Sequence, residues 1–110
     1  MSFVTFIANK VLSFAPAGAT LTDRSGSITA GGTAQALAAA NTSRRGWRLQ
    51  NTSSGDLWFN DIGGTASIGG AGCFKVASLG YYESPVGGGS QAAISIFGAT
   101  TAQTFSASEW

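Results

Sequence analysis

The sequence predicts an all-β fold of the sandwich or barrel type. From Ile28 onward, short runs of β-prone residues alternate with clusters of turn residues, as they do in sandwiches and barrels. Two of these runs, on either side of the Asn51–Asp56 turn, also alternate apolar and polar residues with the period of a strand. The helix-prone run, residues 35–40, is too short to be a stable helix alone.

Residues 1–25 differ in character from the rest of the chain. Large apolar side chains are dense there, and they alternate poorly, which is typical of strands covered on both faces. Strands are expected at residues 3–8 and 10–14, before Pro16, Gly18 and a turn at residues 23–26. Two interpretations stay open: these are ordinary core strands, or they form an extended arm that packs on a neighbouring molecule. The arm's candidate contacts are Phe3, Phe6, Ile7, Leu12 and Phe14.

The later strands are predicted in order along the remainder of the chain. Their expected ranges are residues 27–30, 34–38, 46–51, 56–60, 73–77, 79–84, 92–97 and 103–108. Asn41 and Asn51, each followed by Thr-Ser, are expected to form Asx-turns at strand ends.

The segment from Arg44 to Asp61 is interpreted as a hairpin at the centre of the domain. Alternation places Trp47 and Leu49 on one face and Arg48 on the other. One register suits both runs: Leu49 opposite Leu57, Trp47 opposite Phe59, and Arg48 opposite Trp58. The outward Arg48 and Trp58 would then form a cation–π contact.

The same residues resemble a recurring β-domain of tailed phages. The resemblance rests on Thr33-Ala34-Gln35, Asn41 to Gly46, Gln50 to Ser53, Leu57 to Asn60, Gly63 to Ala66, Phe74-Lys75-Val76, Tyr81-Tyr82-Glu83, Ala93 to Ala99, and the Phe105 to Trp110 ending. Such domains occur as small capsid decoration (cement) proteins with a jelly-roll-like sandwich, and within phage fibre proteins. The match covers about residues 26–110 and implies a jelly-roll-like antiparallel sandwich there, with residues 1–25 as an N-terminal arm or additional strands.

Enzyme chemistry has little support in the sequence. The chain has no histidine and one cysteine, which excludes Ser-His-Asp and Cys-His catalysis and a conventional structural zinc site. Gly87–Ala92 fits a dinucleotide-binding spacing but leads into a strand pattern, where that fingerprint needs a helix. Asp56 and Asp61 bracket one strand and point to opposite faces, so they are interpreted as turn residues. We expect no enzymatic activity, catalytic residue, cofactor or metal.

Arg44, Arg45 and Arg48 surround Trp47, and three roles are possible for them. They could stack nucleic acid, protect a solvated strand edge, or pair with carboxylates of a partner subunit. The chain has a net charge of +1 and a pI near 7.9, so it is less basic than a typical nucleic-acid-binding domain. Partner contacts are favoured slightly over edge protection, and both over nucleic acid.

Partners are expected because the core is small and the surface carries few charges. Asn9 and Lys10 interrupt the N-terminal apolar run, so it does not fit a signal peptide, and no stretch is long enough to span a membrane. We therefore expect synthesis in the host cytoplasm and, from the resemblance, a place on the outer capsid surface of a virion. The expected function is decoration and stabilisation of the capsid, with the major capsid protein and further copies of the chain, as a homodimer or homotrimer, as partners.

The alternative function is that of a receptor- or carbohydrate-binding domain of a phage fibre or spike. Trp58, Asn60, Tyr81 and Tyr82 would form its aromatic sugar platform. Ordinary packing of these aromatics inside a sandwich is the favoured interpretation.

Overall fold

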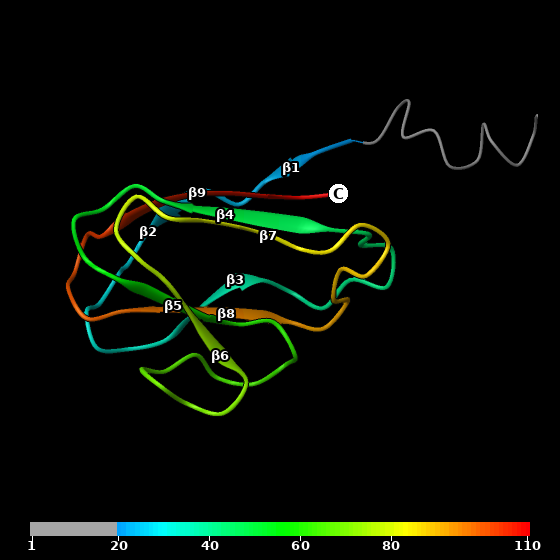
Figure 1. The fold of residues 1–110 in the computed structure, drawn as a ribbon. Helices are drawn as coiled ribbons and strands as arrows, with labels where there is room; N and C mark the ends of the chain where they lie inside the picture. Colours follow the sequence, from blue (N-terminus) through cyan, green and yellow to red (C-terminus); the bar gives the residue numbers. More distant parts are fainter. Residues whose placement is uncertain (1–19) are drawn as a thin grey trace, which may run out of the picture.

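The structure is a computed structural model, and it describes residues 20–110. These residues form two antiparallel sheets and contain no helix, which confirms the predicted all-β sandwich (Figure 1). The strands are β1 (Thr22–Asp23), β2 (Gly26–Ser27), β3 (Gln35–Ala38), β4 (Trp47–Asn51), β5 (Leu57–Asn60), β6 (Cys73–Val76), β7 (Tyr81–Glu83), β8 (Ile94–Gly98) and β9 (Thr104–Glu109). The predicted strands at 3–8 and 10–14 lie outside the described residues.

The strand order is that of a jelly roll. One sheet has the order β1-β9-β4-β7, with β2 also paired to β9, and the other has the order β3-β8-β5-β6. Pairing is nested along the chain, because β2 pairs with β9, β3 with β8, β4 with β7 and β5 with β6. This nesting is what two successive Greek keys produce. The resemblance to a jelly-roll-like domain therefore predicted the architecture correctly.

The predicted hairpin is wrong, because β4 and β5 belong to different sheets (Figure 1). Leu49 lies opposite Ala107 and Tyr82, whereas Leu57 lies opposite Val76 and Gly98. The predicted facing of the side chains is nevertheless right, since β4 and β5 both turn their apolar residues inward. Residues 52–56 carry the chain from one layer to the other, so the two strands face each other across the core.

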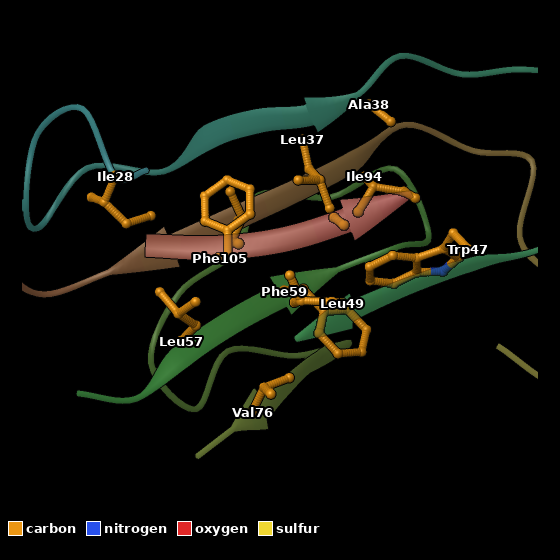
Figure 2. Packing of buried hydrophobic residues seen from close by; sticks show 12 residues of the cluster. Ile28, Leu37, Ala38, Trp47, Leu49, Leu57, Phe59, Val76, Ile94 and Phe105 are labelled. Atoms are coloured by element: carbon orange, nitrogen blue, oxygen red, sulfur yellow. The ribbon is translucent and has the colours of Figure 1, made fainter. Parts of the chain in front are cut away.

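The core fills the space between the two sheets (Figure 2). Its buried side chains are Ile28, Leu37, Ala38, Trp47, Leu49, Leu57, Phe59, Val76, Ile94, Ile96, Phe105 and Ala107. Trp47 of β4 packs edge-on against Phe59 of β5, with ring centroids 4.9 Å apart, and Tyr82 of β7 lies 4.6 Å from Phe59. Aromatic packing between the layers therefore joins β4, β5 and β7.

The sandwich begins before the predicted boundary at residue 26. Thr22 and Asp23 pair with Glu109 and Ser108, and the Arg24 amide donates to the Ala107 carbonyl at 2.7 Å. The first sheet therefore includes residues 22–23 as a short, exposed strand, whereas the apolar residues 3–14, to which the core-strand and arm interpretations apply, lie outside the described residues.

Candidate interaction surfaces

Arg44, a predicted partner contact, is part of the interior. Its side chain is fully buried, and its Nε atom donates to Glu109 Oε1 at 3.2 Å. The two terminal nitrogens donate to three carbonyl oxygens, those of Ser90, Ala92 and Ala39. The prediction is therefore wrong for Arg44: its carboxylate partner comes from the same chain, and its role is to hold two loops, residues 39–46 and 84–93, and β9 together.

Glu109 is the acceptor at the centre of this network. Arg24 Nε donates to its Oε2 at 2.7 Å, and Asn41 Nδ2 donates to its Oε1 at 3.1 Å. Burial raises the pKa of Glu109, but the hydrogen bonds from Asn41 and Arg24, together with the charge and hydrogen bond of Arg44, outweigh burial and leave that pKa below its ordinary 4.5. The carboxylate is therefore held ionised, and it fixes the point at which the chain enters the first sheet.

Arg45 and Arg48 are exposed, so they are available to a partner. Arg45 lines a shallow hollow of about 240 Å³ with Thr20, Thr22 and Trp110, next to the chain entry. Arg48 lies between Ser108 and Glu83 on the outer face of the first sheet, and its Nε donates to Ser108 Oγ at 2.9 Å. The predicted contact between Arg48 and Trp58 is wrong, because these residues lie on different sheets; the aromatic ring near Arg48 is that of Trp110, at 6.0 Å.

The outer face of the first sheet is polar. A hollow of about 300 Å³ is lined by Asp23, Ser25, Arg48, Gln50, Tyr81, Ser106, Ala107 and Ser108. Beside it, the Tyr81 hydroxyl donates to Glu83, and this hydrogen bond raises the pKa of Tyr81. Charges of both signs alternate across the strands here, which is typical of a solvated sheet face.

The outer face of the second sheet carries Trp58. Trp58 lies opposite Phe97 on one side and Lys75 on the other, and it lines a hollow of about 280 Å³ with Asp56, Ile68 and Thr100. The Lys75 ammonium lies 4.0 Å from the Asp56 carboxylate.

The predicted sugar platform does not form, because its four residues are separated. Trp58 faces outward from the second sheet and Tyr81 outward from the first, whereas Tyr82 packs against the core. Asn60 is buried and accepts hydrogen bonds from the amides of Ile62 and Gly64, so it anchors the loop of residues 61–72.

The strand β6 lies at a free edge of the second sheet and is bordered by exposed apolar side chains. They come from β6 itself and from the segments before and after it. We call Ile62, Ile68, Phe74 and Leu79 the β6 edge surface. Most of the large apolar side chains exposed in residues 20–110 belong to it, and the sequence did not predict it. Alternation in Phe74-Lys75-Val76 predicted a strand, but nothing local marks that strand as an edge.

Leu79 is unusual in both exposure and backbone conformation. It is 72 % exposed, with a φ of 62°, in the left-handed region that favours glycine or asparagine. In a turn that faces only water, leucine at such a position has a backbone conformational cost and no burial that would offset it. The residue therefore supports a role of this surface in contacting a partner.

The carboxylates of the described residues make structural contacts. Asp61 accepts from Trp47 Nε1 at 3.2 Å, and Asp56 pairs with Lys75. Among residues 20–110 no three His, Cys, Asp or Glu side chains group together in a way that could hold a metal ion. Over the same range, no helix is long and apolar enough to cross a membrane.

The remaining predicted contacts, Phe3, Phe6, Ile7, Leu12 and Phe14, lie outside the described residues. Comparison of the chain with protein families, with curated proteins and with solved structures finds no match.

Proposed function

We propose that the protein is a non-enzymatic structural component of a tailed-phage virion. It decorates the outer capsid surface and bridges neighbouring subunits of the major capsid protein. Copies bound across subunit boundaries would stabilise the capsid by mass action, because a bound subunit resists separation.

The observation that supports this proposal best is the β6 edge surface on a small jelly roll. Phe74 is 61 % exposed and Ile68 62 % exposed, in a chain whose net charge is only +1. Exposed large apolar side chains beside a free strand edge offer a surface for contact with another protein. The resemblance of residues 26–110 to capsid decoration proteins supports the major capsid protein as the partner.

The apolar residues 3–14 are proposed as the capsid-binding segment. The chain enters the first sheet at β1, where Arg24 and Glu109 fix it beside the exposed Arg45. The described chain therefore begins at a defined place on the first sheet. Each large apolar side chain that docks on a coat subunit contributes about 1.5–3 kcal/mol, so two or three could dominate the affinity.

The test is co-sedimentation with capsids that lack the protein, together with a thermal melt. A chain of residues 20–110 keeps every described strand, so it should fold with the β-type circular dichroism of the full chain and no longer bind. The full-length variant Phe6→Ser should also lose affinity, whereas Val86→Ser, at a fully exposed loop residue, should bind normally. If residues 20–110 do not fold, residues 3–14 are core strands; if they fold and bind, attachment lies elsewhere.

The hollow at Trp58 favours one other function, carbohydrate binding by a fibre or spike domain. An indole beside Asp56, Lys75 and Thr100 offers a stacking face with polar groups around it. Glycan binding by the full chain that is lost in Trp58→Ala, without capsid binding, would establish this function instead.

A further inference from the structure

Of the free sheet edges, β6 is the least protected against pairing with another strand. The edge made by β1 and β2 is interrupted at Arg24 and Ser25, and β3 contains a bulge between Ala36 and Ala38. Pro85 follows β7 closely. Bulges, interruptions and prolines are the usual protection of an edge. By contrast, β6 pairs regularly with β5 along its whole length.

The charge on β6 gives it little protection. Lys75 is its one charged residue, and Asp56, which directly precedes β5, lies 4.0 Å from the Lys75 ammonium. A lysine that is paired within its own subunit repels an approaching strand less than a free one does, although two such lysines directly opposite each other still repel.

Phe74 is a core-facing side chain at an open side of the sandwich. It lies opposite Phe59 on the inner face of the sheet, with ring centroids 5.9 Å apart, yet it is 61 % exposed. Tyr82 of β7 also packs on Phe59, so β6 and β7 border the same open side. Additional burial of Phe74 requires a group from outside the described residues.

We propose that a second copy of this chain docks on β6, by antiparallel pairing of the two β6 strands about a two-fold axis. The sheet β3-β8-β5-β6 then continues into the same sheet of the partner subunit. This goes beyond the proposed function and specifies the homodimer that the sequence led us to expect, and it holds or fails in solution without reference to a capsid.

The side chains of β6 select the register of this pairing. Directly opposed residues lie on the same face of a sheet, so a symmetric pair must join residues of like facing. One such register places Phe74 opposite the partner's Phe74 and Cys73 opposite the partner's Lys75. The other places Lys75 opposite the partner's Lys75, which is unfavourable because like charges face each other. The first register buries both phenyl rings and keeps the two lysines apart.

Cysteine cross-linking tests the register, and light scattering tests the dimer. In a Cys73→Ser background, Phe74→Cys should form a covalent dimer under mild oxidation and Lys75→Cys should not. With the native Cys73 retained, Lys75→Cys should cross-link, because positions 73 and 75 oppose each other across the axis. Phe74→Asp, at an exposed position, should weaken dimerisation by about tenfold or more, since two rings lose burial; Val86→Asp should not.

A monomer at high concentration or a trimer would overturn the proposal, as would cross-linking through position 75 but not 74 in the Cys73→Ser background. A dimer that withstands Phe74→Asp would place the interface elsewhere. Failure to bind capsids, with these cross-links formed, would contradict the capsid proposal alone.

Discussion

Replacement of Glu109 by glutamine should destabilise the fold more than removal of an exposed charge does. The substitution keeps the shape of the side chain but removes the negative charge that the fully buried Arg44 faces. Removal of one partner of a buried ion pair typically costs about 3–5 kcal/mol. Three carbonyl oxygens still accept from Arg44. We therefore expect the lower end of that range, about 3 kcal/mol, out of a total of about 5–15 kcal/mol.

The assay is urea unfolding followed by tryptophan fluorescence, with Arg24→Gln as the matched control. Arg24 bonds the same carboxylate but is 42 % exposed, so its ion pair is screened by water. Exposed pairs contribute about 0.2–1 kcal/mol. A loss in Glu109→Gln no larger than that in Arg24→Gln would refute the central role of the buried pair.

The pH dependence gives a second measurement of the same group. Because the folded pKa of Glu109 lies below its ordinary 4.5, the ionised carboxylate stabilises the native state fully above that value. This contribution should decline as the pH falls below about 4.5 and be lost below the folded pKa. Stability between pH 5 and pH 2, measured as ΔG of unfolding, should fall less steeply in Glu109→Gln than in the native sequence.

Three further predictions concern packing and backbone. Trp47→Ala should cost about 3–5 kcal/mol in urea unfolding, as buried aromatic truncations do, whereas the outward-facing Trp58→Ala should cost much less; equal losses would contradict the assigned faces. Leu79→Gly should leave stability unchanged or raise it by up to about 1 kcal/mol, because the left-handed φ costs leucine more than glycine; a clear loss would show that Leu79 packs within its own subunit. Asn51→Ala should cost about 1–3 kcal/mol, since the Val76 carbonyl loses a donor in a buried site and the Gly55 carbonyl keeps only that of Ser53; a neutral result would mean that water replaces the Asn51 amide.

Local sequence patterns correctly predicted which side chains of β4 and β5 point into the core and where two Asx-turns form. Alternation placed Trp47, Leu49, Leu57 and Phe59 in the core, and all four are buried. The Asx-turns at Asn41 and Asn51 are confirmed, because Asn41 Oδ1 accepts from the amide of residue 43 and Asn51 Oδ1 from that of residue 53. Both features depend on residues within a few positions of each other, which a single sequence displays.

Features that depend on distant segments were not predictable in the same way. Arg44 was predicted to be a surface residue because its partner, Glu109, lies 65 positions away in the sequence. Two of the three carbonyls that surround its guanidinium, those of Ser90 and Ala92, belong to a loop that only the fold brings beside it. The edge position of β6 likewise follows from the order of the strands in the sheet. Charges beside aromatic residues are therefore weak indicators of exposure unless the topology is known.

The hairpin error has a specific physical origin. In a sandwich, two alternating strands can bury their apolar residues equally well side by side in one sheet or facing each other in two. Polarity alternation alone therefore leaves this choice open. In this chain, Asn51 stabilises the arrangement in two sheets: its side chain is fully buried, and its Nδ2 donates to the Gly55 and Val76 carbonyls where the chain leaves one layer for the other. A solvated hairpin turn needs no such buried donor. A nested jelly roll also pairs β4 with β7, so the segment after β4 has to cross the core, and the amide of Asn51 stabilises that crossing.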